Sequence, residues 1–250
     1  MSPRAVLLFD IDGVIRDVGG SYRKAIVETV HHYSGQRPSP ESIDALKAEG
    51  CWNNDWEASL ELLRRQGQQD LPAFEALVEV FNGFYFGGDP EGDPAAWTGF
   101  IRNEPLLVDA ALFAALSAAD VAWGFVSGAE PPSARFVLQT RLGLEQPPLI
   151  AMGEAPDKPD PSGFLRLASA LAPPSVPVAY LGDTVADVTT VVRARQAKPD
   201  QHFISLAVAP PHLHSSPRRA AYEDQLRAAG ADVVIPATTA VLAALEQAIA

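Results

Sequence analysis

The chain has 250 residues, of which 47% are hydrophobic and 20% charged, and its formal net charge is −12. This length and composition are typical of a globular protein with a full core, and they exclude a disordered chain. The negative charge disfavours nonspecific binding to nucleic acid or to an anionic membrane, so we expect neither as a partner.

The first predicted element is a buried strand over residues 5–9, where an apolar run stops at acidic residues and Gly13. This strand leaves no room for a signal peptide ahead of it. No apolar stretch of the sequence approaches the length that spans a membrane without a charge, a proline or a glycine in it. We therefore expect a cytoplasmic protein.

Two carboxylates, Asp10 and Asp12, follow this strand directly. In an extended chain, residues two apart point to the same side. Like charges this close repel unless a cation or a shared proton separates them, and hard divalent cations prefer oxygen ligands. A metal site is one interpretation of the pair, and a solvated acidic turn is the simpler one.

The next part of the chain, residues 20–90, has the apolar spacing of helices and no strand pattern. Glycine-rich joints bracket this block, at residues 18–20 on one side and in the Gly-, Pro- and Asp-rich residues 87–94 on the other. The joints are either ordinary loops or the hinges of a mobile lid. Helices are expected at 21–33, 41–48, 56–66 and 71–84.

From about residue 106 onward, short apolar runs alternate with helical patterns, which predicts right-handed crossovers and a mostly parallel sheet. The fold class is therefore α/β, a doubly wound sheet with an inserted all-helical domain. The expected domains are an α/β core of residues 1–18 and 98–250 and a helical domain of residues 19–97. Further strands are expected at 121–126, 149–152, 176–181, 203–208 and 232–235. Further helices are expected near 109–119, 132–142, 162–171, 185–195, 217–229 and 238–249.

Several of the predicted strand ends carry polar groups, and ligands of open parallel sheets bind beyond the carboxyl ends of the strands. Singly, each group has a simpler explanation: an ordinary turn for Ser127, a solvated surface amine for Lys158, and a helix cap for Asp183. Their joint occurrence, each at a strand end, favours a single site. In addition to the two aspartates above, the candidate residues are Ser127, Gly128, Lys158, Asp183 and Asp187.

Together these residues resemble the four signature motifs of the haloacid-dehalogenase-like phosphohydrolase superfamily, subfamily I. The helical block sits where that superfamily carries its type 1 cap, so the resemblance covers essentially the whole chain. One departure follows the fourth motif, where many relatives have an Ala-Gly pair and this chain has Arg195-Gln196; it concerns the end of a helix and not the chemistry. The four motifs are Asp10-Ile-Asp12-Gly13-Val14, then Ser127, then Lys158 with Pro159, and finally Gly182-Asp183 with Asp187.

The resemblance implies phosphoryl transfer through an aspartyl-phosphate, with Asp10 as the nucleophile. It makes Asp12 the general acid that protonates the leaving oxygen and later activates water. The dehalogenases of this superfamily lack an acid at the position of Asp12, because a halide leaves without a proton. The presence of Asp12 therefore favours phosphatase chemistry.

The resemblance also implies Mg²⁺ as the cofactor, and groups that hold the equatorial oxygens of the phosphate. Asp12 would act through its carbonyl oxygen, and Asp187 would support a metal-bound water or Lys158 from outside the ligand set. The implied metal site comprises Asp10, Asp12, Asp183 and Asp187. The implied phosphate-binding groups are Ser127, Gly128 and Lys158.

In this cap type a loop reaches the leaving group, and our candidates for substrate contacts are Arg23, Trp52, Asn53 and Asn54. Alternatively, Asn54 or Asp55 caps a helix, both tryptophans pack in the domain, and Arg23 forms a structural salt bridge. Cys51, the only cysteine, excludes an internal disulfide and is expected to be a partly buried apolar residue. Segments 21–26 and 50–56 resemble a branch with mostly unassigned substrates, some members of which are fused to a histidine-biosynthesis enzyme.

The function predicted from the sequence is a Mg²⁺-dependent phosphatase of a small phosphorylated metabolite. A phosphomutase of the same superfamily is the nearest alternative, because it uses nearly identical core residues. A noncatalytic module that binds a phosphorylated metabolite is the alternative from another class. The sequence predicts no oligomeric state.

Overall fold

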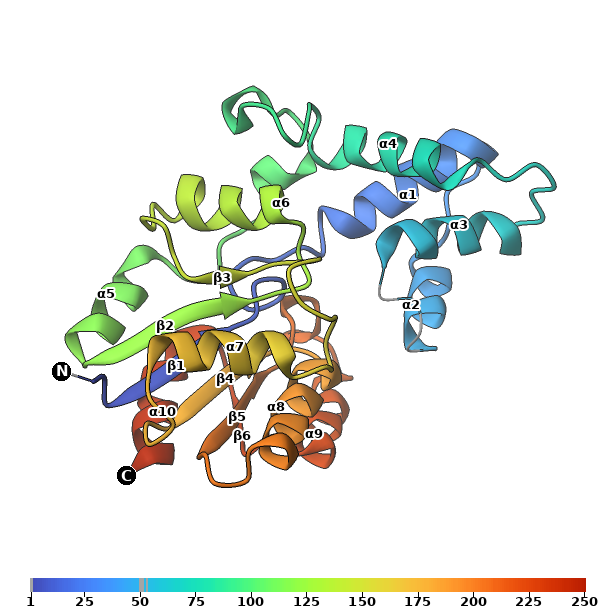
Figure 1. Ribbon diagram of the computed structural model, residues 1–250. Helices are drawn as coiled ribbons and strands as arrows, with labels where there is room; N and C mark the ends of the chain where they lie inside the picture. Colours follow the sequence, from blue (N-terminus) through green and yellow to red (C-terminus); the bar gives the residue numbers. More distant parts are fainter. Residues whose placement is uncertain (1, 50–51, 53) are drawn as a thin grey trace. The chain divides into compact units, whose positions relative to one another are not determined.

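A computed structural model of the chain describes residues 2–49, 52 and 54–250, so Met1, Gly50, Cys51 and Asn53 lie outside the described residues. The chain forms two compact units, drawn in Figure 1. The core unit comprises Met1–Asp17 and Pro105–Ala250, and the helical unit comprises Val18–Glu104. Residues 98–104 belong to the helical unit, where Lys24 Nζ lies 4.3 Å from the centre of the Phe100 ring.

The core unit is built on one sheet of six parallel strands in the order β3-β2-β1-β4-β5-β6. This confirms the predicted doubly wound α/β fold. The strand order reverses beside β1, and such a switch point is where ligands of open parallel sheets bind. The strands are β1 Ala5–Phe9, β2 Val121–Val126, β3 Leu149–Ile150, β4 Val178–Gly182, β5 Phe203–Val208 and β6 Val233–Ile235.

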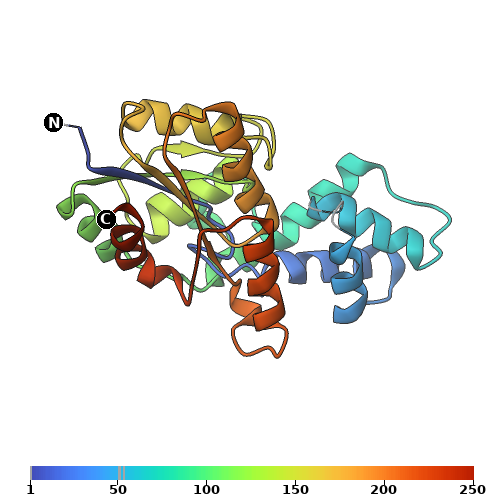
Figure 2. The ribbon, with the colours of Figure 1, turned by 90° about the horizontal axis from the view of Figure 1, so that it is seen from below.

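Helices cover both faces of this sheet (Figure 2). On one face, Phe9 of β1 packs edge-on against Phe113 of α5, with 5.7 Å between the ring centres. On the other face, Val6 and Leu8 of β1 pack in one buried cluster with Phe164 of α7. The alternation along β1 therefore directs Asp10 to the α7 face, as period-two geometry requires. The helices are α5 Ala110–Ala118, α6 Pro131–Arg135, α7 Ser162–Leu171, α8 Val185–Ala197, α9 Arg219–Ala229 and α10 Val241–Ile249.

Two predicted helices of the core unit differ in detail from the structure. The helix expected at 132–142 begins as α6 and continues as a π-helical segment, Phe136–Arg141 (η3), whose wider turn accompanies the burial of three consecutive apolar residues from Phe136 to Leu138. Helix α8 continues to Ala197, because the Arg195 guanidinium donates to the Phe203 carbonyl and stays packed.

The helical unit has an aromatic core. Tyr22 stacks on Tyr85 with 4.3 Å between the ring centres, and Phe81 packs beside both. The buried carboxylate of Glu104 accepts hydrogen bonds from Ser21 Oγ at 2.5 Å and from Tyr85 at 3.2 Å. The α-helices are α1 Tyr22–Ser34, α2 Pro40–Ala48, α3 Asp55–Arg65 and α4 Phe74–Tyr85, and short 3₁₀ turns cover Pro94–Ala96 and Phe100–Asn103.

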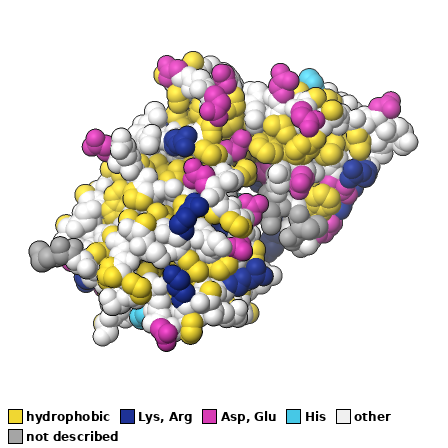
Figure 3. Space-filling view, viewed as in Figure 1, with side chains coloured by type: hydrophobic (Ala, Val, Ile, Leu, Met, Phe, Trp, Pro, Cys, Tyr) yellow, Lys and Arg dark blue, Asp and Glu magenta, His cyan; other side chains and the backbone are white. Residues whose placement is uncertain are grey.

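The surface and helix lengths bear on possible partners. None of the helices in the described residues combines the length and the apolar character needed to cross a membrane. On the face shown in Figure 3, basic side chains lie apart and alternate with acidic ones.

Candidate active site

Three of the predicted site carboxylates meet at the carboxyl ends of β1 and β4. Asp10 follows β1 and is anchored by its N–H, which donates to the Leu181 carbonyl at 2.9 Å. Asp183 follows β4, and Asp187 lies in the first turn of α8. One carboxylate oxygen from each residue lies within 4.8 Å of the other two, and all three side chains are buried.

Two glycines make this close approach possible. Gly13 has a φ of +75°, and a Cβ built on it would lie 2.0 Å from Asp183 Oδ2. A Cβ on Gly182 would lie 2.2 Å from the Cβ of Asp187. Any larger residue at either position would displace a carboxylate, so the glycines in the first and fourth motifs have a direct steric role.

Lys158 lies among these acids. Its Nζ is 3.1 Å from Asp10 Oδ1 and 2.5 Å from Asp187 Oδ1. It also donates to the hydroxyl of Tyr180 at 3.2 Å. The side chain is only 16% exposed, so the Lys158 ammonium is largely shielded from solvent and is not the solvated surface amine of the alternative.

Asp187 has both of its oxygens occupied by protein groups. Its Oδ2 accepts hydrogen bonds from the N–H and the hydroxyl of Thr184, while the Asp187 N–H donates to Thr184 Oγ1, which completes a capping box at the start of α8. Its Oδ1 accepts from Lys158. This arrangement suits a supporting carboxylate better than a direct metal ligand.

The three acids differ in their affinity for protons. Burial raises the pKa of Asp10 from 3.8 to about 6 despite the attraction of Lys158, and the charge of Asp187 adds to the rise. Burial, with the charges of Asp187 and Asp10, also holds the pKa of Asp183 well above its usual value. Burial opposes ionisation of Asp187 too, but Lys158 and Thr184 outweigh it and lower the pKa of Asp187. Asp187 is thus the carboxylate that neutralises the charge of Lys158. The negative charges of Asp10 and Asp183 are not fully neutralised by neighbouring groups.

The predicted phosphate-binding loop follows β2. Ser127 is buried, its N–H donates to the Ile150 carbonyl, and its Oγ accepts from the N–H of Ala129 at 3.2 Å. These bonds fix the loop and leave the hydroxyl proton to be donated. A Cβ on Gly128 would meet nothing within 4 Å, so the backbone there is open to close approach by a ligand.

Asp12 lies outside the group of three carboxylates. Its Oδ1 accepts from Nε of Arg16 at 2.7 Å, and Arg16 is fully buried. The loop that carries Asp12 is held from another side, since Thr238 donates to the Val14 carbonyl at 2.7 Å. Sequence reasoning missed Arg16, although an arginine four residues after an aspartate in an otherwise apolar stretch was a signal for such a pair.

Two tyrosines at the site were also missed. Tyr180 of β4 contacts Lys158, and the hydroxyl of Tyr222 in α9 donates to the Asp183 carbonyl at 2.9 Å. A tyrosine inside a buried strand needs a hydrogen-bond partner, which would have singled out Tyr180. Nothing in the sequence pairs α9 with the end of β4, so Tyr222 carried no comparable signal.

The donor set fits a divalent cation such as Mg²⁺. The three clustered side chains offer only oxygen atoms, which hard cations prefer. Asp10 Oδ1 is buried and accepts no hydrogen bond in the described part of the chain, although Lys158 Nζ is near it. An acceptor that is buried without a donor, beside a second under-compensated carboxylate, is what a cation would satisfy.

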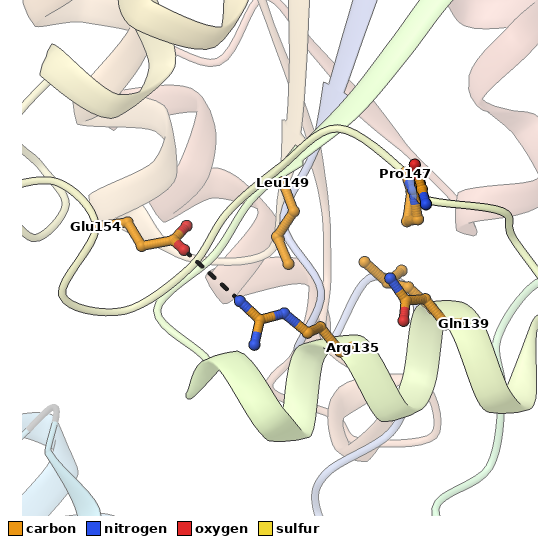
Figure 4. A pocket seen from close by; sticks show the side chains of 7 residues that line it. Arg135, Gln139, Pro147, Leu149 and Glu154 are labelled. Atoms are coloured by element: carbon orange, nitrogen blue, oxygen red, sulfur yellow. Dashed lines mark ion pairs between the residues drawn. The ribbon is translucent and has the colours of Figure 1, made fainter. Parts of the chain in front are cut away.

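One surface hollow of the core unit lies away from this site. A surface hollow of about 230 Å³ lies elsewhere on the core unit, where Arg135 of α6 faces Glu154 at 4.0 Å (Figure 4). Gln139, Pro147 and Leu149 complete its labelled lining. It contains none of the candidate site residues, and both charged side chains are largely exposed. The clustered carboxylates are the stronger indication of chemistry.

In the helical unit, the structure shows intraunit partners for the candidate substrate contacts that it describes. Arg23 pairs with Asp44 at 2.7 Å. Asn54 is the N-cap of α3, and its side chain accepts from the N–H groups of Trp56 and Glu57. Trp52 donates from Nε1 to Glu49. Asn53 lies outside the described residues.

Comparisons with known proteins agree with this geometry. Phosphatase Tt82 from Thermococcus thioreducens shares the fold with a TM-score of 0.64 at 22% identity, over 88% of this chain and 98% of that one. A predicted phosphoglycolate phosphatase from Haemophilus somnus 129PT has a TM-score of 0.70 at 14% identity, over 98% and 99% of the two chains. At these identities the likeness concerns the fold alone.

A curated relative is more similar in sequence. The imidazoleglycerol-phosphate dehydratase of Phytophthora nicotianae is 31% identical over 191 residues, which are 75% of this chain and 41% of that protein. The chain thus spans less than half of this relative's length. The family model of haloacid dehalogenase-like hydrolases matches residues 5–195, from β1 through the insertion to the helix after the fourth motif. With that match and the acids, the ammonium and the hydroxyl at the expected strand ends, the chain belongs to the haloacid dehalogenase-like hydrolases.

Proposed function

We propose that the protein is a Mg²⁺-dependent phosphatase that hydrolyses a small phosphorylated metabolite through an aspartyl-phosphate. The observation that carries this proposal is the environment of the Asp10 carboxylate. Its Oδ1 is buried, accepts no hydrogen bond from the described residues, and lies 3.1 Å from the ammonium of Lys158. A carboxylate that hydrogen-bond donors do not fully occupy is available both to hold a cation and to attack phosphorus.

Side chains of the site carry out the first half of the reaction, in which the phosphoryl group passes from the ester to Asp10. An oxygen of Asp10 forms the bond to phosphorus as the bond from phosphorus to the ester oxygen breaks. Asp12, whose Oδ1 accepts a hydrogen bond from Arg16, gives a proton to that leaving oxygen. Lys158 and Ser127 donate to the phosphoryl oxygens, where negative charge accumulates.

In the second half, Asp12 accepts a proton from water as the water oxygen attacks phosphorus and the bond to Asp10 breaks. The products are free phosphate and the original carboxylate. Asp10, Asp183 and the backbone carbonyl of Asp12 would hold the cation, with Asp187 supporting Lys158. When bound, the cation supplies positive charge that offsets the repulsion between the Asp10 carboxylate and the phosphate.

We further propose that the helical unit acts as a cap that reads the leaving group, with Arg23, Trp52, Asn53 and Asn54 as the candidates. The name of the curated relative specifies a phosphorylated compound, which supports a phosphorylated metabolite as the substrate class here. The dehydratase activity in that name belongs to a protein of which this chain spans 41%, so we do not extend it. A cytoplasmic location remains a prediction from the sequence.

The test is phosphate release from a panel of phosphorylated metabolites and a generic ester, with Mg²⁺ and with excess chelator. Asp10→Asn should reduce turnover by about 10⁴-fold or more, because the nucleophile is lost. The matched control is Asp157→Asn, which removes an exposed carboxylate next to Lys158 in the chain. Near-normal turnover by folded Asp10→Asn, or full activity in chelator, would contradict the proposal.

The same assay separates the alternatives. A phosphomutase would return the phosphoryl group to the substrate and release little phosphate, whereas a binding module would bind the metabolite without any turnover. Mass spectrometry of acid-quenched protein should show one added phosphoryl group in the wild type and none in Asp10→Asn.

A further inference from the structure

Tyr180 is a fully buried tyrosine in the centre of the sheet, on β4. Its ring packs in the buried cluster between the sheet and α7, where the centre of the ring lies 5.6 Å from that of Phe164. Its hydroxyl lies at the carboxyl end of the strands, next to the site. Burying a phenol there without a partner would cost stability, so its contacts are informative.

The phenol oxygen has three polar neighbours, and it has one proton to donate. The Val126 carbonyl oxygen is the nearest at 2.7 Å, and Asp187 Oδ1 lies at 3.1 Å. Lys158 Nζ, at 3.2 Å, has only protons to offer, so towards Lys158 the phenol must be the acceptor. The closest contact assigns the phenol proton to Val126, whose carbonyl directly precedes Ser127.

The hydrogens of the Lys158 ammonium can be accounted for in the same way. Two are bound, by Tyr180 and by Asp187 Oδ1. Asp10 Oδ1 lies 3.1 Å away as an ion pair, but it does not accept a hydrogen bond in the described structure. The third hydrogen therefore remains for a ligand oxygen beside Asp10.

We propose that Tyr180 is a positioning residue that ties Lys158 to the Ser127 loop. The inference rests on the proposed function, since the phosphate-binding roles of Lys158 and Ser127 come from there. The phenol accepts one ammonium hydrogen and donates its own to the carbonyl of Val126, which is two strands away with β1 between. Two phosphate-binding groups from different strand ends thereby share one rigid anchor, and the ammonium cannot rotate freely.

The test is Tyr180→Phe, which removes one oxygen atom and leaves the ring packing intact. The affinity for inorganic phosphate, measured by calorimetry with Mg²⁺ present, should fall about three- to tenfold, the worth of one hydrogen bond. Tyr33→Phe is the matched control, because it also removes a phenol bonded to a backbone carbonyl, that of Ala76 in the helical unit. The control should bind phosphate as the wild type does.

A second readout follows the ammonium itself. The chain has four lysines, and the Lys158 side chain lies among buried acids, so ¹⁵N-lysine labelling should give one ammonium signal protected from solvent exchange. Tyr180→Phe should speed the exchange of that signal, which a change confined to packing would not do. Unchanged phosphate affinity and unchanged exchange in the folded variant would overturn the inference.

The wild type alone also tests the inference, should Tyr180→Phe not fold. A Lys158 ammonium that exchanges rapidly in the wild type would overturn it, and a protected one supports it. Failure of the proposed function has a different signature: a wild type that binds phosphate but releases none from any ester. In that case, phosphate affinity and ammonium exchange still decide the role of Tyr180.

Discussion

In the core unit three buried carboxylates cluster beside the ammonium of Lys158, whereas in the helical unit, apart from the buried Glu104, the charges described below pair with opposite charges near the surface. Arg23 pairs with Asp44, Lys47 with Asp55, and Arg65 with Glu49 and Glu61. Hydrogen bonds from Arg65 and Trp52 lower the pKa of Glu49 to about 2. Balanced surface pairs contribute little to stability, while buried like charges reduce it and are kept for chemistry. The comparison assigns reactivity to the core unit and structural roles to most charges of the helical unit.

The largest expected effect on stability comes from removing the Lys158 ammonium. Lys158→Met should lower the free energy of unfolding at pH 8 by about 3–5 kcal/mol, because it leaves the buried acids without their cation. It should also reduce turnover by about 10²- to 10³-fold. Denaturant unfolding and initial rates measure the two effects, with the exposed Lys198→Met as the control. Equal unfolding free energies for the two variants would show that the cluster does not depend on Lys158.

In the core unit, Asp10 is expected to support activity and to reduce stability. The rise of the Asp10 pKa from 3.8 to about 6 means that its carboxylate destabilises the metal-free fold above pH 6, by about 3 kcal/mol. Asp10→Asn should therefore melt higher than the wild type in chelator at pH 8, although it is inactive. Added Mg²⁺ should stabilise the wild type far more than the variant. A lower melting temperature of Asp10→Asn in chelator would contradict this account of the cluster.

The same pKa predicts how metal binding depends on pH. The folded value lies above the unfolded value, so in metal-free protein the contribution of Asp10 to stability is greatest below pH 3.8 and falls as the pH rises towards 6. A bound cation favours the carboxylate, so Mg²⁺ binding near pH 6 should release protons, and its affinity should weaken below that pH. Calorimetry in two buffers of different ionisation enthalpy counts the protons. More proton release at pH 8 than at pH 6 would contradict the coupling of Mg²⁺ binding to deprotonation of Asp10.

The smallest expected effects come from substitutions in the helical unit, and they test whether its polar side chains have structural roles only. Asn54→Ala should cost about 1 kcal/mol of stability, because the cap of α3 is lost. Asn53→Ala tests whether the cap contacts the leaving group through this residue: such a contact should lower kcat/KM for the true substrate about tenfold or more and spare a small generic ester. Equal losses on both esters would show that Asn53 supports the core chemistry instead.

Much of the core unit could be predicted from the sequence, because its signals are local. Apolar runs of four to six residues followed by Gly, Asp or Ser give the strands and their ends. In a parallel sheet all such ends lie at one edge, so the order of strands in the chain was enough to bring Asp10, Ser127 and Asp183 together. The match of residues 5–195 to the family model agrees with that reasoning.

Other features were decided only by the tertiary structure, because they depend on contacts between segments far apart in the chain. The sequence placed Asp187 in the metal site, as support for either a metal-bound water or Lys158; its bonds to Thr184 and Lys158 show both oxygens in use. It offered Asn54 as a substrate contact or a helix cap, and the structure shows that its side chain accepts the capping hydrogen bonds of α3. It was silent on Tyr180, whose bonds span 54 residues to Val126 and 22 to Lys158. Periodicity reports which face a residue occupies, but hydrogen bonds depend on where the partner's atoms lie, and only the packed sheet fixes that.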